Sequence, residues 1–162
     1  MTAAGALVVI GVGNPYRRDD GVGPAVIARL RDRLPAGRRA TVRLDESDGE
    51  PSQLLELWSG ADLAIVVDAV RTAGGQPGTI YCRELDDVPV IGSSTSSHRV
   101  ELGDAVALAR AVDRMPATLV LYGIEVVDTS FGPDLTPAVA AAVDQVAAAV
   151  LARLEGARDV RV

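Results

Sequence analysis

Residues 7–13 of the chain read Leu-Val-Val-Ile-Gly-Val-Gly. A short aliphatic run that ends in glycines is typical of a buried parallel strand that leads into a loop. Residues 22–34 then carry apolar side chains at helical spacing, and the helix-breaking residues 35–37, Pro-Ala-Gly, follow. These two segments predict a strand followed by a helix, with Pro24 at the first helical position and Gly23 before it.

The same alternation of strand and helix continues to about residue 154. Thr136 is placed to cap the last helix, and Pro137 is placed at its first position. We expect further strands at 41–44, 63–67, 79–83 and 118–124, and helices around 54–58, at 100–112 and at 137–154. The pattern predicts an α/β fold in one domain over residues 1–162. The expected architecture is a three-layer αβα sandwich with a central, mostly parallel twisted sheet of about five strands.

The composition narrows the classes of function. Hydrophobic residues make up 48% of the 162 residues, which is enough for a sizeable core. All 16 basic residues are Arg, but 22 acidic residues outweigh them and give a net charge of −6, which disfavours a nucleic-acid partner. We expect no membrane span and no secretion signal, because the apolar runs are shorter than about 20 residues and no basic segment precedes the first of them. A single cysteine, Cys82, fits a reducing compartment and a buried apolar role in its strand. The sequence therefore predicts a cytoplasmic monomer.

Candidate site residues follow the predicted strands, where ligands bind in open α/β sheets. Asp19 and Asp20 come after the first strand, Asp68 ends the third, and His98, the single histidine, opens a helix after the serine-rich segment 93–97. One aspartate would suffice as a helix cap, so at least one of the pair has another role. Two carboxylates and a neutral imidazole could hold a metal ion and leave a coordination position open. Alternatively, Asp68 is a solvated strand end and His98 a structural hydrogen-bonding residue.

Three other chemistries fit the sequence less well. A dinucleotide-binding module would need a third glycine where Tyr16 stands, and the acidic pair would repel a pyrophosphate. A Ser-His-Asp hydrolase would need a nucleophile elbow, but segment 92–96, Gly-Ser-Ser-Thr-Ser, lacks the second glycine. A Cys82–His98 pair would need a cysteine outside the strand pattern.

The motifs together resemble the hydrogenase maturation endopeptidases. Members of this family remove the C-terminal extension from the nickel-loaded large-subunit precursor of nickel–iron hydrogenases. The similar segments run nearly the full length of the chain: Gly11-Val12-Gly13-Asn14, Asp19-Asp20-Gly21-Val22-Gly23, Val67-Asp68-Ala69-Val70, Pro77-Gly78-Thr79, Ser97-His98, Gly123-Ile124-Glu125, Gly132 and Leu135-Thr136-Pro137. One segment departs: residues 45–51 read Asp-Glu-Ser-Asp-Gly-Glu-Pro where many members carry Asp-Gly-Gly-Thr, a stretch associated with substrate discrimination.

The resemblance implies an aspartyl-type endopeptidase whose metal-binding residues fall on Asp20, Asp68 and His98. These residues would engage nickel that the hydrogenase large-subunit precursor brings with it, and zinc or cadmium would serve as surrogates. Because the sequence offers no credible Ser or Cys nucleophile, we expect attack by water, with Asp19 as one candidate for the assisting base. A non-enzymatic, metal-sensing maturation chaperone that uses the same three residues is the alternative.

Overall fold

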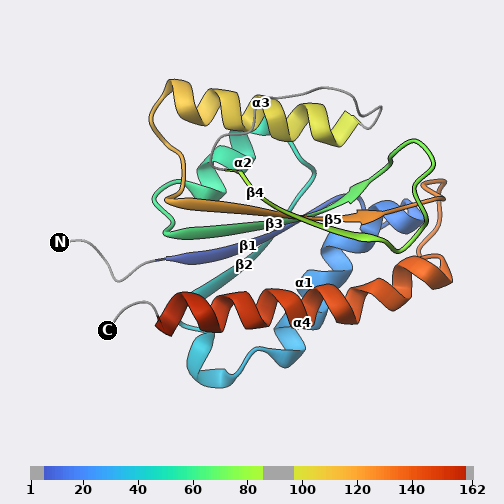
Figure 1. Cartoon of the computed structure of the whole chain (residues 1–162), viewed down its shortest axis with the longest axis horizontal. Helices are drawn as coiled ribbons and strands as arrows, with labels where there is room; N and C mark the ends of the chain where they lie inside the picture. The colour runs from blue at the N-terminus through green and yellow to red at the C-terminus, as the bar shows by residue number, and fades with distance from the viewer. Residues whose placement is uncertain (1–5, 86–96, 160–162) are drawn as a thin grey trace.

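The computed structural model describes residues 6–85 and 97–159, with side chains for residues 6–85 and 102–157. Within these residues, strands and helices alternate along most of the chain (Figure 1). The elements are β1 (Leu7–Val12), the 3-10 helix η1 (Arg18–Gly21), α1 (Val22–Arg33), the 3-10 helix η2 (Ala36–Arg38), β2 (Val42–Ser47), α2 (Pro51–Trp58), β3 (Leu63–Val70), β4 (Ile80–Glu84), α3 (Ser97–Ala111), β5 (Thr118–Glu125) and α4 (Pro137–Asp159).

The strands form one five-stranded sheet in the order β2-β1-β3-β5-β4. Strands β2, β1, β3 and β5 are parallel, whereas β4 runs antiparallel to β5 at one edge. Helices α1 and α4 cover one face of the sheet and α2 and α3 cover the other (Figure 1). The predicted αβα sandwich with a mostly parallel sheet is therefore confirmed. The carboxyl-terminal ends of its four parallel strands lie on the same side of the molecule. We call this end of the sheet, which is distinct from its outer strands, the carboxyl edge.

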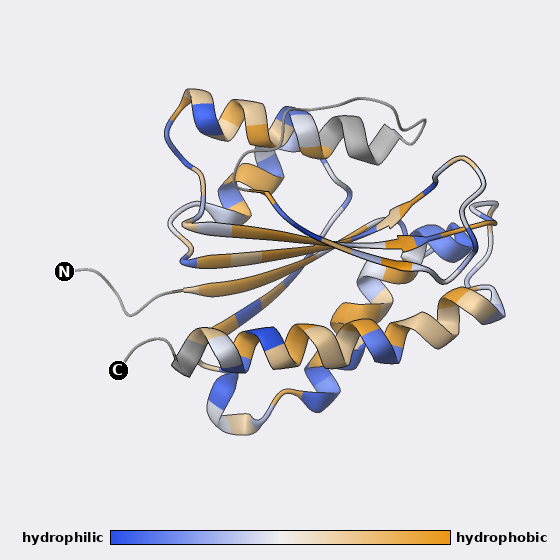
Figure 2. Ribbon diagram, viewed as in Figure 1, coloured by the Kyte–Doolittle hydropathy of each residue, from blue (hydrophilic) through white to orange (hydrophobic). Residues whose placement is uncertain are grey.

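Two hydrophobic clusters fill the spaces between the layers. Alternate residues of a strand point to opposite faces, so Ile65 and Val67 of β3 contribute to the cluster under α1 and α4, while Ala64 and Val66 contribute to the cluster under α2 and α3. All of β3 is buried, and Figure 2 shows the orange, apolar centre of the sheet between helices with mixed faces. This explains why the central strands have continuous rather than alternating apolar sequences.

Helix α1 lies unusually close to the sheet because two glycines face each other. A Cβ atom added to Gly23 would lie 2.4 Å from the Val12 carbonyl oxygen and 2.7 Å from that of Val67, and one added to Gly11 would lie 2.5 Å from the Gly23 oxygen. Backbone atoms cannot move aside as a flexible side chain can. The start of α1 is thereby fixed against the ends of β1 and β3.

Two predicted boundaries near the candidate site are wrong. Helix α1 begins at Val22 with Gly21 as its N-cap, so Pro24 occupies the third helical position. The prediction placed Pro24 first because a proline lacks an N–H, but every position of the first turn tolerates that loss. Strand β3 also continues past Asp68 to Val70, since Ala69 and Val70 still pair with β5.

The expectation of a buried Cys82 is wrong as well. Its side chain is exposed, and its sulfur lies 3.6 Å from a guanidinium nitrogen of Arg153 in α4. The cause is the position of β4 at the edge of the sheet, where much of the strand faces solvent.

Helix α4 is longer than predicted and contains a long apolar stretch. By length and composition alone, residues Pro137–Ala157 could cross a membrane. In the structure, however, Val139, Val143, Val146 and Val150 form a buried stripe against the sheet and α1. We therefore describe α4 as a core helix of an α/β domain.

We predict that Gly23→Ala lowers the free energy of unfolding by about 3 kcal/mol, because the new methyl group would meet backbone oxygens of two strands. Gly156→Ala is the matched control. It makes the same change in α4, where a Cβ atom meets nothing within 4 Å, and should raise stability by up to about 1 kcal/mol. Chemical denaturation of both variants provides the measurement. Equal stability of the two variants would contradict the close packing of α1.

Candidate functional site

The loop between β1 and α1 presents Asp20 at the carboxyl edge. Gly13 begins this loop with a φ of +141°, and a Cβ atom there would lie 1.9 Å from the Asp20 carbonyl oxygen. The Asn14 N–H donates a hydrogen bond of 2.9 Å to Oδ2 of Asp20, whose residue is 8% exposed. Helix η1, which carries Asp20, also contacts β3. The glycine and the asparagine together fix the Asp20 carboxylate on an element that contacts the central strand.

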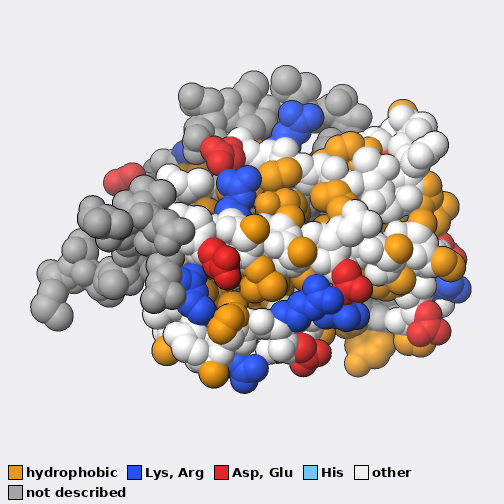
Figure 3. All heavy atoms as spheres, turned by 60° about the horizontal axis from the view of Figure 1, so that its bottom comes forward, with side chains coloured by type: hydrophobic (Ala, Val, Ile, Leu, Met, Phe, Trp, Pro, Cys, Tyr) orange, Lys and Arg blue, Asp and Glu red, His pale blue; other side chains and the backbone are white. Residues whose placement is uncertain are grey.

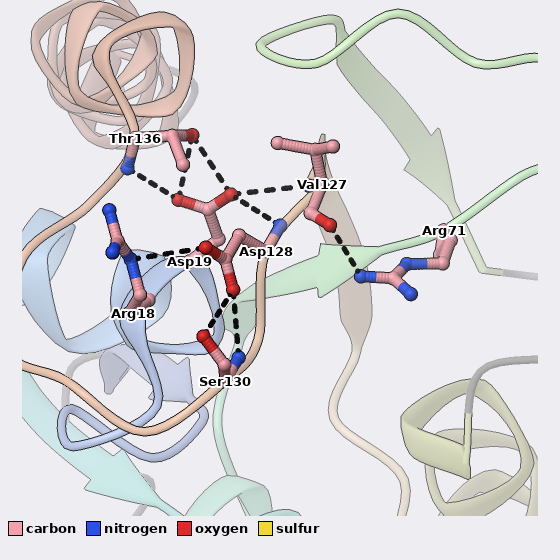
Figure 4. Close-up of polar contacts among 7 residues, drawn as sticks. All are labelled: Arg18, Asp19, Arg71, Val127, Asp128, Ser130 and Thr136. Carbon is pink, nitrogen blue, oxygen red and sulfur yellow. Dashed lines mark hydrogen bonds and ion pairs between the residues drawn. The ribbon is translucent and has the colours of Figure 1, made fainter.

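Asp19 is fully buried and joins two loops that are far apart in the sequence (Figure 4). Its Oδ2 accepts hydrogen bonds from the backbone N–H groups of Val127 and Asp128, at 3.2 and 3.1 Å. Its Oδ1 accepts one of 2.7 Å from the Thr136 N–H, and the Thr136 hydroxyl lies 2.9 Å from both oxygens. Asp19 therefore holds the β1–α1 loop against the β5–α4 loop. Thr136, predicted as a helix cap, donates its hydroxyl to this carboxylate.

A second layer of polar contacts surrounds this junction on the solvent side. Nε of Arg18 lies 3.4 Å from Oδ2 of Asp128, and a guanidinium nitrogen of Arg71 donates a 3.0 Å hydrogen bond to the Val127 carbonyl (Figure 4). Hydrogen bonds from the Ser130 hydroxyl and N–H hold the pKa of Asp128 below its usual value. Asp128 thus stays ionised opposite Arg18 at neutral pH.

Asp68 lies in β3, is 3% exposed, and shares the strand face that packs under α2 and α3. Its neighbour across the sheet is Gly123 of β5, which has no side chain. Asp68 is therefore not a solvated strand end, because it lies inside a fully buried strand. The burial favours a functional role over the solvated-end alternative.

A buried carboxylate that the sequence analysis did not assign to a role is Glu125, at the end of β5. It is 1% exposed and accepts hydrogen bonds of 3.0 and 3.1 Å from the Thr72 N–H, together with one from the Thr72 hydroxyl. A Cβ atom on Gly75 would collide with it. Glu125 therefore holds the β3–β4 loop at the carboxyl edge. The sequence signals for it were an acid directly after the predicted apolar strand 118–124 and its place in the family-like segment Gly123-Ile124-Glu125.

His98 is the second residue of α3, and its side chain lies outside the described ones. Helix α3 begins on the side of the molecule toward which the parallel strands point (Figure 1). The described side chains include those of Asp20 and Asp68 but not that of His98. Among them, no group of three or more His, Cys, Asp or Glu residues could hold a metal ion. Convergence of the three residues therefore stays a prediction.

The divergent segment 45–51 borders the same loop. The Gly13 N–H donates a 2.9 Å hydrogen bond to the carbonyl of Ser47, the last residue of β2. Glu50 caps α2 by accepting hydrogen bonds from the Ser52 and Gln53 N–H groups, and the Ser52 hydrogen bonds lower its pKa. Sequence changes in this segment can thus reach the Asp20 loop through one backbone contact. Segment 92–96, which fits a Ser-His-Asp hydrolase poorly, lies outside the described residues.

Comparison with known proteins assigns the family. Residues 40–153 match the family model described as hydrogenase maturation protease. The hydrogenase 2 maturation protease of Escherichia coli (strain K12) is 28% identical over 153 residues, which cover 91% of this chain and 90% of that protein. The structure of the E. coli hydrogenase maturating endopeptidase HybD superimposes with a TM-score of 0.81 at 26% identity, covering 94% of this chain and 93% of that one.

A more distant structure shares the fold. The [NiFe] hydrogenase maturation protease HybD from Thermococcus kodakarensis has a TM-score of 0.72 at 20% identity over 92% of this chain and 98% of that chain. With the family match spanning well over half of the sequence, the chain belongs to the hydrogenase maturation proteases and is a hydrolase of peptide bonds.

Proposed function

We propose that this protease removes the C-terminal extension of a nickel-loaded hydrogenase large-subunit precursor, acting as a monomer in the cytoplasm. Asp20, Asp68 and His98 would contact the nickel that the substrate carries. The observation that carries the proposal is the pair of buried carboxylates, Asp20 and Asp68, on contacting elements at the carboxyl edge of a chain in this family.

The chemistry of the two carboxylates supports a dication as the recognised group. Neighbouring carboxylates repel each other, and a doubly charged cation between them replaces that repulsion with attraction. Imidazole is a common nickel ligand as well, and α3 carries His98 in its first turn. Three protein ligands do not complete a closed coordination shell, so the precursor's own ligands can remain on the ion.

Attack by water fits the described residues better than attack by a thiolate. Cys82 lies exposed on β4 beside Arg153, on an element that does not carry the candidate residues. In the proposed step, a water oxygen bonds to the scissile carbonyl carbon, the C–N bond breaks, and the water proton passes to the leaving amine. A metal ion held beside the scissile segment would orient it and could polarise its carbonyl.

Asp19 receives a different role from the one suggested by its sequence alone. Both of its oxygens already accept hydrogen bonds from Val127, Asp128 and Thr136, and its burial is complete. We therefore propose that Asp19 positions the two loops, whereas its service as a general base remains a sequence-based prediction.

We predict that nickel gates cleavage from the substrate side. The protein should shorten the nickel-loaded precursor but not the metal-free precursor, although both contain the same peptide bond. Incubating metal-free precursor, nickel precursor, and nickel precursor with a strong chelator in parallel, followed by mass spectrometry, measures this. Equal cleavage of the first two would rule out gating, and binding without cleavage of any form would favour the chaperone alternative.

We predict that His98→Ala and Asp68→Asn each weaken binding of zinc or cadmium at least about 100-fold, because even indirect supports of metal ligands are worth about 10–100-fold. The chain has one histidine, so no other imidazole can replace it. Asp113→Asn, at an exposed position beyond the end of α3, is the control and should bind as the wild type does. Calorimetric titration that shows wild-type heat in His98→Ala would remove that residue from the site.

We predict that Gly13→Val lowers kcat about 100-fold while the protein still unfolds cooperatively, since displacement of a positioned group by about 1 Å has that effect. The valine would push on the Asp20 carbonyl. Gly60→Val controls for backbone strain, because Gly60 also has a positive φ, +76°, but no atom lies within 4 Å of its Cβ position. Normal activity per folded molecule in Gly13→Val would show that Gly13 has a purely structural role.

A further inference from the structure

Two aromatic side chains project into solvent at the carboxyl edge. Tyr16 is 72% exposed and Phe131 is 81% exposed, and no other residue among the exposed large hydrophobic side chains of the described structure is aromatic. The whole chain has only five aromatic residues, one Phe, one Trp and three Tyr, so two of the five face water next to the candidate site. Exposed aromatic residues are enriched at binding surfaces rather than at random on a protein surface.

Backbone hydrogen bonds hold these two residues together although they lie in different loops. The Gly132 N–H donates to the Tyr16 carbonyl, and the Arg18 N–H donates to the Gly132 carbonyl, both at 2.9 Å. The guanidinium carbon of Arg17 lies 5.0 Å from the centre of the Phe131 ring. We call the three residues Tyr16, Arg17 and Phe131 the aromatic ridge. Because its backbone is already fixed, little conformational entropy is lost when a partner binds there.

Two members of the aromatic ridge, Tyr16 and Arg17, belong to the same turn that holds Asp20. Oδ1 of Asn14 accepts a hydrogen bond from the Tyr16 N–H, while the N–H of Asn14 donates to the Asp20 carboxylate. The Asp20 N–H in turn donates to the Arg17 carbonyl. A partner that contacts the ridge is thereby placed on the loop that positions the candidate carboxylate.

The charge on the ridge indicates the chemistry of the partner. Arg18 pairs with Asp128, whereas no carboxylate among the described side chains pairs with Arg17, whose guanidinium stacks on an aromatic ring. The chain as a whole carries a net charge of −6, and on the face shown in Figure 3 the Arg side chains lie among Asp and Glu side chains. A guanidinium beside exposed rings suits a segment with an apolar side chain and a nearby carboxylate.

We propose that the aromatic ridge docks an extended segment of the hydrogenase precursor, with an apolar side chain against Tyr16 and Phe131 and a carboxylate on Arg17. This inference rests on the proposed function and identifies where the protein part of the substrate binds, apart from its nickel. Docking on the ridge fixes the precursor relative to Asp20 before the bond is cut. Tyr and Arg are also among the residue types that are enriched where binding energy concentrates at interfaces.

The first test is the double variant Tyr16→Ser/Phe131→Ser in the full chain. With nickel-loaded precursor, KM should rise about tenfold while kcat changes less than about twofold, because the ridge contributes binding that is equal in ground and transition states. The dissociation constant for the metal-free precursor, which needs no cleavage, should rise by a similar factor. Both side chains are mostly exposed, so thermal melts should match the wild type.

The matched control is Leu108→Ser/Val112→Ser. These two side chains are 40% and 50% exposed, and they lie where α3 leads back toward the start of β5, at the opposite edge of the sheet. KM and the dissociation constant should remain at wild-type values.

A second pair of variants tests the charge of the ridge. Arg17→Gln should raise the dissociation constant for the precursor about threefold and flatten its salt dependence. Arg83→Gln, at an exposed position on β4, should change neither.

The outcomes separate the two proposals. If the wild type binds the precursor through the ridge but cleaves no form of it, the proposed function is wrong and the ridge stands. If cleavage is normal and the ridge variants keep wild-type KM and dissociation constant, the ridge proposal is wrong and the function stands. The ridge proposal would also be overturned if analytical ultracentrifugation showed the wild type as a dimer and the ridge variant as a monomer with unchanged KM. The ridge would then be a contact between two copies of the chain. Absence of both binding and cleavage in the wild type would overturn both.

Discussion

The arrangement of the loops at the carboxyl edge depends on the hydrogen bonds that the buried Asp19 carboxylate accepts. The carboxylate is fully buried and accepts hydrogen bonds from the backbone of Val127, Asp128 and Thr136. A buried carboxylate is stable only when such hydrogen-bond donors replace water. Removal of any one donor would leave part of the charge unsatisfied and lower the free energy of unfolding. The turn that carries Tyr16 and Asp20 and the loop that carries Phe131 both take their positions from this junction. The glycine contacts of α1 fix the other side of the β1–α1 loop.

Local sequence patterns predicted most of the architecture. Continuous apolar runs predicted the central strands β1, β3 and β5, because burial on both faces leaves such a signature. The partly buried strands β2 and β4 were predicted from shorter, mixed segments. Pattern alone could not show that β3 continues through Asp68, because strand pairing uses backbone groups and is indifferent to one acidic side chain. Nor could it show that Cys82 is exposed, since exposure there follows from the place of β4 at the edge of the sheet.

The sequence supplies candidate residues for the site, but it does not show which structural role each of them has. Adjacent aspartates at 19 and 20 look equivalent in the sequence, yet one is enclosed by the β5–α4 loop and the other lies against the Asn14 turn. Their difference depends on residues more than a hundred positions away, which no local pattern encodes. Glu125 shows the same limit: its partner Thr72 is 53 residues distant. Family resemblance supplied the selection of Asp20 that local physical chemistry could not make.

The long-range bonds of Asp19 also determine when the protein can become competent during its synthesis. The donors to its carboxylate are 108, 109 and 117 residues further along the chain. On the ribosome, β1, α1, β2 and β3 can associate early, but the Asp19 junction cannot close until residue 136 has emerged. A nascent chain therefore carries the acidic pair without the loop that orders it. The order of synthesis therefore makes the acidic pair one of the first parts of the candidate site to be made and one of the last to be held in place.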